Sequence, residues 1–267
     1  MILAKEAGPG FHVPAVTELL EFKPLFSFMV GGLEFRVTFI TILMFVLTAA
    51  LAVVFVAGLR RATVIPGKLQ NALEAAVDGV RENIVAPTLG ADGERYMPLL
   101  ATMFFFVFTM NFMEVVPGVQ FPLTSRMALP VFFALLAYVI FNYIGIREQG
   151  LIHYFKGIMF PPGVPKPIYI ILTPIEFAST FIFRPLTMAV RLFANMMAGH
   201  VMLTIFFLAS AYFLYRSDSM FLHILSPFPF ILAVILTGFE MFIGLIQAFI
   251  ITILTSVYIA GALHPEH

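Results

Sequence analysis

The sequence contains no cysteine and no tryptophan, and only 11% of its 267 residues are charged. Without cysteine, the chain cannot form disulfides, Fe–S clusters, c-type haem attachments or thiolate zinc sites. Soluble globular proteins carry about 25% charged residues. This chain has too few polar groups to cover a surface in water, so a soluble enzyme is excluded.

Three further absences narrow the class of protein. The net charge is zero, and the chain therefore lacks the basic excess that a nucleic-acid partner requires. The phosphate-binding pattern G-x-x-x-x-G-K-[ST] does not occur, so any nucleotide chemistry belongs to other chains. No internal repeat is evident, which argues against a transporter built from inverted repeats. We predict neither a cofactor nor a metal site.

The residues that are present indicate an all-α polytopic membrane protein, since 61% are hydrophobic and the mean hydropathy is +1.00. An uncharged run from Val37 to Leu59 is long enough to cross about 30 Å of hydrocarbon. Arg60 and Arg61 follow it, and basic residues beside a span stay on the cytoplasmic side. We therefore expect residues 1–36 to be extracytoplasmic and residues 37–59 to form the first span.

Residues 60–95 have a different pattern. Apolar side chains recur there at helical spacing opposite polar ones: Leu69, Leu73, Val77, Val80 and Ile84. This pattern predicts an amphipathic helix on the cytoplasmic surface of the membrane, with Pro66 near its start. The alternative is a helix that packs on a partner protein.

Residues 96–147 are predicted to hold the second and third spans, with Arg147 at the return to the cytoplasm. Residues 148–167 form a cytoplasmic loop, and its proline cluster from Pro161 to Pro167 excludes a helix at that cluster. Residues 168–267 are overlong for upright spans. The apolar stretch from Ile168 to Tyr215 would measure roughly 70 Å as a helix. It is either two spans or one steeply tilted or broken helix, and the two possibilities put the C-terminus on opposite sides.

Arg191 is the first functional candidate, because an arginine at membrane depth costs about 2.5–3.5 kcal/mol or more. Its guanidinium stays protonated, so it cannot relay a proton but can hold a carboxylate beside it. Asn195, four residues later, shares its helix face. The alternative is a structural arginine whose side chain reaches the membrane surface.

His200 and Glu240 form a second candidate pair. If the two C-terminal helices run antiparallel with Gln247 level with Arg191, His200 lies about 13.5 Å and Glu240 about 10.5 Å further outward. A histidine and a carboxylate at one depth suit a proton entry path. The alternative is a buried structural pair.

Two more carboxylates are candidates for the proton path. Glu176 lies fifteen residues before Arg191, toward the cytoplasmic end. Glu114 closes the second span, where it is either part of the path or an acid at the membrane interface. These spacings suggest two polar routes that are separated by the fixed charge of Arg191.

Three motifs resemble subunit a of the F-type ATP synthase membrane sector. They are Asn111-Phe-Met-Glu114-Val-Val-Pro117, Arg191-Leu-Phe-Ala-Asn195-Met-Met-Ala-Gly-His200 and Gly244-Leu-Ile-Gln247-Ala-Phe-Ile-Ile-Thr-Ile-Leu-Thr. The similarity extends from about Val37 to the C-terminus. The run from Pro174 to Pro185 resembles the actinobacterial branch.

The resemblance implies a proton-conducting stator with two aqueous half-channels against a rotating ring of c subunits. Arg191 matches the arginine that meets the ring carboxylate, and Asn195 and Gln247 match its polar partners. His200 and Glu240 match the outer half-channel pair with their order exchanged. Glu114 matches an outer-channel acid. Glu176 matches a cytoplasmic-side acid, with an offset of about one residue. Arg126 departs from the family, many of whose members have an acid nearby.

The resemblance also implies five spans, including a tilted C-terminal hairpin at residues 168–267 that faces the c-ring, and a cytoplasmic C-terminus. The implied partners are the c-ring, b-type peripheral stalk subunits, the remaining synthase complex and the lipid of the plasma membrane. The chain is then not an enzyme on its own. The alternatives are a self-contained secondary transporter and a membrane scaffold. The lack of internal repeats argues against the transporter, and a scaffold leaves the buried charges without a function.

Overall fold

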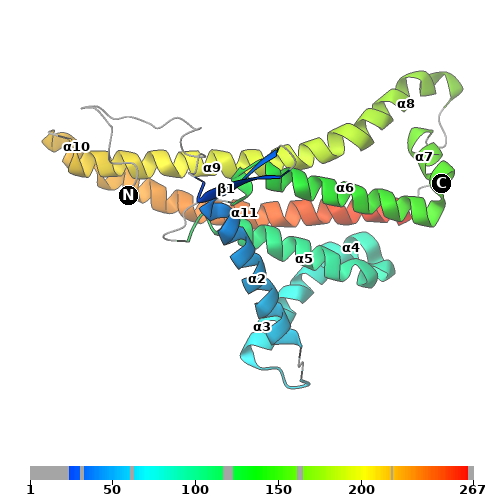
Figure 1. Ribbon diagram of the computed structural model, residues 1–267, viewed down its shortest axis with the longest axis horizontal. Coiled ribbons are helices and arrows are strands. Elements are labelled where there is room, and N and C mark those ends of the chain that lie inside the picture. Colours follow the sequence, from blue (N-terminus) through cyan, green and yellow to red (C-terminus); the bar gives the residue numbers. More distant parts are fainter. Residues whose placement is uncertain are drawn as a thin grey trace.

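The computed structural model describes residues 24–30, 33–60, 63–116, 123–160, 165–217 and 219–263. Most of residues 1–36, Arg61, Pro117 and part of the proline-rich loop, about which the sequence made predictions, lie outside the described residues. The described chain is almost entirely helical (Figure 1). Its elements are β1 (Phe26–Val30), β2 (Leu33–Val37), α2 (Phe39–Leu59), α3 (Lys68–Val80), π-helix η1 (Arg81–Val85), α4 (Ala86–Leu89), η2 (Gly90–Asp92), α5 (Gly93–Phe112), η3 (Leu123–Ser125), α6 (Ala128–Gln149), α7 (Leu151–Met159), η4 (Lys166–Ile168), α8 (Tyr169–Ala178), π-helix η5 (Ser179–Phe183), α9 (Arg184–Tyr215), α10 (Met220–Leu225) and α11 (Pro227–Leu263).

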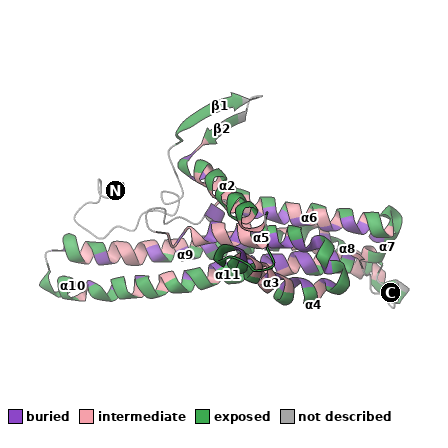
Figure 2. Cartoon of the chain, turned by 90° about the horizontal axis from the view of Figure 1, so that it is seen from below, coloured by how far each residue is buried: buried purple, intermediate pink, exposed green. Residues whose placement is uncertain are grey.

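A β-hairpin precedes the first long helix, which an all-α prediction did not include. Strands β1 and β2 pair antiparallel, with Phe26 opposite Val37, and stand away from the helices (Figure 2). Aromatic and β-branched residues favour strands here. Arg36 donates a 2.8 Å hydrogen bond to Glu34 and so lowers the pKa of that exposed carboxyl. The hairpin ends where Thr38 caps α2.

Helix α2 begins two residues later than predicted and ends at the predicted residue. The Thr38 side chain accepts a hydrogen bond from the Thr41 amide, and the Thr41 side chain accepts from the Thr38 amide, which forms a capping box. Val37, the predicted start of the span, belongs to β2 instead. The apolar run therefore contributes Val37 to β2 and residues 39–59 to α2, with the capping residue Thr38 between the two elements.

Four helical stretches among the described residues are long and apolar enough to cross a membrane: Phe39–Leu59, Ala128–Gln149, Tyr169–Tyr215 and Met220–Leu263. The chain is therefore a multi-pass membrane protein. Helix α5 has 20 residues and carries Glu94 in its first turn, and it is not one of these four. The count of five spans, the sides on which the termini lie and the tilt of the C-terminal helices stay predictions.

The overlong C-terminal stretches are two helical runs that lie side by side and antiparallel (Figure 1). Tyr169–Tyr215 forms one run of 47 residues rather than two spans separated by a loop. The five-residue π-helix η5 interrupts its α-helical pattern, and α8 diverges from α11 beyond that point. The sequence left open either two spans or one long tilted or broken helix. The structure has a single helical run, interrupted at η5.

Helix α11 forms the centre of the molecule, with α5, α6 and α9 packed around it. In lipid, helices associate through close packing rather than by leaving water, and small residues permit the closest approach. The buried alanines Ala137, Ala189 and Ala248 meet this requirement, each at most 2% exposed. They lie in one cluster with larger buried side chains: Met103, Val107, Phe133, Leu192, Met196 and Ile251.

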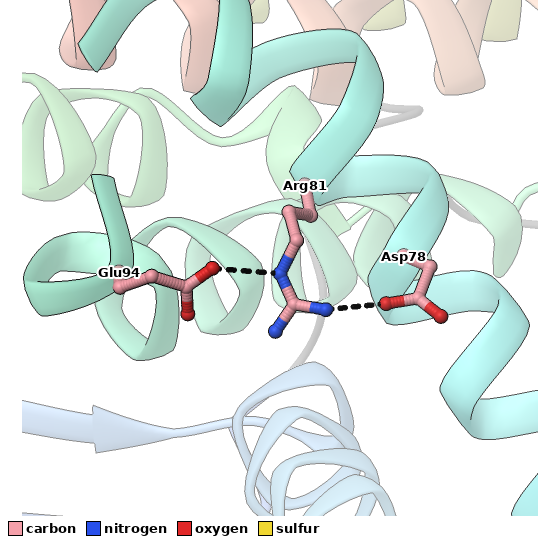
Figure 3. A network of polar contacts seen from close by, with 3 residues as sticks. All are labelled: Asp78, Arg81 and Glu94. Atoms are coloured by element: carbon pink, nitrogen blue, oxygen red, sulfur yellow. Dashed lines mark hydrogen bonds and ion pairs between the residues drawn. The ribbon is translucent and has the colours of Figure 1, made fainter. Parts of the chain in front are cut away.

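The predicted amphipathic segment folds back on the same chain. Val80 and Ile84 are buried against α5 and α11, whereas Leu69 at the other end of the segment is half exposed. Arg81 contacts Asp78 (2.5 Å) and Glu94 (3.0 Å) and so joins η1 to the start of α5 (Figure 3). Part of the apolar stripe is therefore covered by the chain's own helices, and the position of α3 at a membrane surface stays a prediction.

Candidate functional site

Asn195 and Gln247 join the two long helices at mid-length. The Asn195 side-chain amide donates a 3.0 Å hydrogen bond to Oε1 of Gln247. Gln247 is only 2% exposed, whereas Asn195 lies on an exposed side of α9. This bond joins α9 to α11.

Arg191 lies one turn before Asn195 and is also exposed. Among the described residues, its guanidinium forms no ion pair or hydrogen bond. The next residue, Leu192, is fully buried, so Arg191 projects from the side of α9 that the chain itself leaves uncovered. The same side of α9 is a shallow apolar surface that includes Ala194 and Ala198. Small residues beside an unpaired cation allow another helix to come close to it.

A second group of polar residues lies further along the pair of long helices. Nδ1 of His200 is 3.9 Å from Oε1 of Glu114, whose side chain is 2% exposed. This distance is too long for a direct hydrogen bond. The Glu240 carboxyl group is buried and lies within electrostatic range of Glu114. We call His200, Glu114 and Glu240 the acid–histidine cluster.

Gly199 makes room for this cluster. A Cβ atom at Gly199 would collide with the carboxylate of Glu240, so the acid packs directly on the backbone of α9. Oε2 of Glu240 has no hydrogen-bond partner in the described part of the chain. Buried carboxylate oxygens of this kind are rare in proteins and mark functional positions more often than structural ones.

The structure brings Glu114 to the two residues that the sequence analysis paired. His200 Nδ1 lies 3.9 Å from Oε1 of Glu114, which follows α5, and Glu240 packs against Gly199, the neighbour of His200 on α9. Helical spacing predicted the depth of Glu240 and His200, but it could not show that Glu114 lies beside them. The sequence analysis left Glu114 as either a proton-path residue or an acid at the membrane interface, and the structure has it within the acid–histidine cluster.

Asn111 supports the cluster and was not singled out for a role from the sequence. Its side-chain amide donates to the Gly244 carbonyl of α11 (3.2 Å), and its Oδ1 accepts from Thr124 (2.5 Å). These bonds hold the end of α5, three residues before Glu114, against α11. The spacing Asn111 to Glu114, nearly one helical turn, was the only signal that could have identified it.

Glu176 is not brought to the other candidates. It is half-buried on α8, on the far side of η5 from Arg191, and forms no ion pair with the described residues. Fifteen residues separate it from Arg191, about 22 Å along a helix. Between the acid–histidine cluster and Glu176, this run carries two arginines, Arg184 and Arg191, and Arg191 is the one nearer the cluster.

A metal centre is not indicated in the part of the chain that the structure describes, where no three His, Asp or Glu side chains gather as ligands would. The arrangement instead provides groups that exchange protons at one position, a permanent cation at a second and a separate carboxylate at a third. Such a series suits proton transfer more than bond-making chemistry.

Comparison with known proteins gives a consistent result. The family model described as ATP synthase A chain matches residues 38–260. The chain is 40% identical to ATP synthase subunit a of Rhodococcus erythropolis, over 97% of this chain and 93% of that protein. It is 40% identical to ATP synthase subunit a of Frankia alni (98% and 89% covered) and 36% identical to that of Streptomyces lividans (97% and 90% covered).

Proposed function

Because the chain belongs to the family of ATP synthase subunit a, a proton-translocating component of the synthase membrane sector, we propose that Arg191 separates two proton paths which serve a ring of c subunits. The chain has no catalytic role in nucleotide chemistry. The observation that carries the proposal is the exposed guanidinium of Arg191, which has no anionic partner among the described residues.

The charge of Arg191 explains why a partner is needed. An arginine that faces lipid costs several kcal/mol, about 2.5–3.5 at the centre of a helix. A carboxylate of a neighbouring ring would remove this cost when it lies opposite Arg191, and the cation would in turn favour the ionised form of that carboxylate. The ring acid then gives up its proton only beside Arg191 and crosses lipid in the neutral form.

The acid–histidine cluster is the outer path in this proposal. His200, Glu114 and Glu240 each hold or release a proton, and none carries a fixed charge as Arg191 does. Protons that enter here reach the ring acid on one side of Arg191. The Asn195–Gln247 bond holds α9 and α11 together, so that the path and the cation keep their separation.

Glu176 is the inner path in this proposal. It lies on the opposite side of Arg191 along the same helical run, so a proton released there cannot return to the cluster without passing the cation. Inward flow supplies about 2.3 kcal/mol per charge for each 100 mV of membrane potential. This energy drives rotation in the direction of synthesis.

The remaining predictions belong to the same proposal. We place the N-terminus outside and the C-terminus inside a plasma membrane that the chain crosses five times, with residues 37–59 as the first span and residues 96–147 as the second and third. Residues 60–95 lie at the cytoplasmic surface and 148–167 form a cytoplasmic loop. Residues 168–267 face the c-ring, and b-type stalk subunits hold the chain against rotation.

The test is ATP-driven proton pumping in membrane vesicles that carry the complex with Arg191→Ala. We expect pumping to be lost while the complex assembles, and passive proton conduction to persist or rise once the soluble sector is removed. The control is Arg95→Ala, which removes an exposed arginine whose partner is Glu148 at 3.5 Å. Undiminished pumping with Arg191→Ala would show that this arginine is structural.

A further inference from the structure

A pocket of about 360 Å³ lies near the end of α11, between α6, α7, η5, α9 and α11. Most of its wall is apolar, including Phe141, Ile158 and Val257. Two polar side chains, Thr180 and Arg184, also line it. The pocket is separate from the acid–histidine cluster and from Arg191.

Arg184 brings a positive charge to the pocket without a matching carboxylate. Its Cζ atom lies 5.1 Å from the ring centroid of Tyr258, within the range of a cation–π contact. It forms no ion pair with an acid of the described chain, unlike Arg81 and Arg95, which contact Glu94 and Glu148. The Tyr258 ring positions the guanidinium but leaves its donors available to a ligand.

Thr180 brings a buried hydroxyl that also lacks a partner. It is 1% exposed, and its Oγ1 has no hydrogen-bond partner in the described chain. Thr187 and Thr252, by contrast, each donate to the carbonyl four residues earlier, at 2.7 and 2.8 Å. Thr180 lies in the π-helix η5, whose altered backbone pattern distinguishes it from those two. A buried hydroxyl in this state is poised to bond a ligand in the pocket.

Helix α7 forms one wall of the pocket through Tyr154 and presents its other side outward. Leu151 and Ile152 are 59% and 82% exposed, and Lys156 is exposed on the same short helix. Exposed apolar residues combined with a lysine are typical of a helix that lies where lipid headgroups meet the hydrocarbon. The pocket therefore opens beside a segment suited to that depth.

We propose that this pocket binds a phosphate group, with Arg184 as the cation and Thr180 as a hydroxyl donor, and that the phosphate is the headgroup of an anionic phospholipid. A guanidinium matches the charge and the several acceptor oxygens of a phosphate. The apolar wall suits the glycerol and acyl part of a lipid. Its apolar side chains form no hydrogen bonds with a free, fully hydrated ion. A bound lipid would join α7, η5 and α11 at the base of the long helical pair.

The experiment uses the purified synthase complex that contains this chain and a phosphatidylglycerol with a photoactivatable group near its headgroup. Labelled peptides are mapped by mass spectrometry. We expect adducts on α7 and on the end of α11, and far fewer when the same group is carried by zwitterionic phosphatidylcholine. Equal labelling of this region by the two lipids would overturn the proposal.

Variants identify the residues involved. We expect Arg184→Gln to reduce labelling roughly tenfold, as for loss of a charge-assisted hydrogen bond. Arg184→Lys retains most of the labelling because it retains the charge, and Thr180→Val, which preserves side-chain volume, lowers it severalfold. Arg95→Gln is the matched control, since Arg95 also lies over a tyrosine ring, at 5.6 Å, but outside this pocket.

Competition distinguishes the two sources of phosphate. Displacement of the lipid label by millimolar inorganic phosphate would overturn the lipid assignment, whereas labelling that persists in its presence supports that assignment. If Arg184→Gln prevents assembly, Thr180→Val decides, because unchanged labelling of that variant contradicts the site. The readout is labelling rather than pumping, so it does not depend on the role proposed for Arg191.

Discussion

His200 and Glu114, which are 86 positions apart in the sequence, face each other across 3.9 Å between Nδ1 and Oε1. Glu114 follows α5, and His200 lies on α9 beside Gly199, the residue on which Glu240 packs. Three groups that exchange protons thus meet where the end of α5 reaches the two long helices. Substitutions at Glu114 and Gly199 test the role of this acid–histidine cluster.

Glu114→Gln should lower ATP-driven proton pumping by roughly tenfold, because it removes a proton carrier that the neighbouring His200 and Glu240 replace only in part. The measurement is the rate of vesicle acidification at a fixed rate of ATP hydrolysis. Glu148→Gln, a change at an acid that is 40% exposed and paired with Arg95, serves as the control and should leave the rate unchanged. Equal rates for the two variants would exclude Glu114 from the path.

Gly199→Ala should impair both assembly and pumping, because its methyl group would occupy the position of the Glu240 carboxylate. Overpacking of this kind typically costs about 1–3 kcal/mol. The double variant Gly199→Ala with Glu240→Asp shortens the acid and should recover part of the loss. Thermal denaturation of the detergent-solubilised complex measures the first effect, and vesicle pumping measures the second.

Gly238→Ala is the matched control for Gly199, since it lies two residues from Glu240 and a Cβ atom there meets nothing within 4 Å. It should leave both stability and pumping unchanged. If Gly199→Ala behaves as Gly238→Ala does, the contact between Glu240 and the α9 backbone has no functional weight.

Thr88 and Ser256 should show measurable coupling in a double-mutant cycle. Their hydroxyl oxygens are 2.5 Å apart and join α4 to α11, and Ser256 is fully buried. Hydrogen bonds between helices in membranes average about 0.6 kcal/mol by such cycles. The free energies of unfolding of Thr88→Val, Ser256→Ala and the double variant give the coupling, and a value of zero would mean that each hydroxyl is equally well bonded without the other.

The sequence predicted the helices of this protein better than their contacts. The uncharged run before Arg60 located α2 to within two residues at one end, since hydropathy depends on the chain alone. It did not show the hairpin, because Val37, the last strand residue, belongs to the same uncharged run as the span that follows. Nor did it show that Val80 and Ile84 pack on their own chain, because an apolar stripe does not specify what covers it.

The candidate site divides in the same way. Composition and spacing alone singled out Arg191, His200 and Glu240 as candidates within long apolar stretches, because charge in lipid is energetically costly, and helical spacing put Gln247 on one stripe with Glu240. The tertiary structure alone decided that Glu114 lies beside His200, that Gly199 admits Glu240 and that Thr180 has no hydrogen-bond partner among the described residues. These relationships depend on which helices meet and on how each is rotated about its axis, and residues far apart in the sequence acquire that relation only when the chain folds.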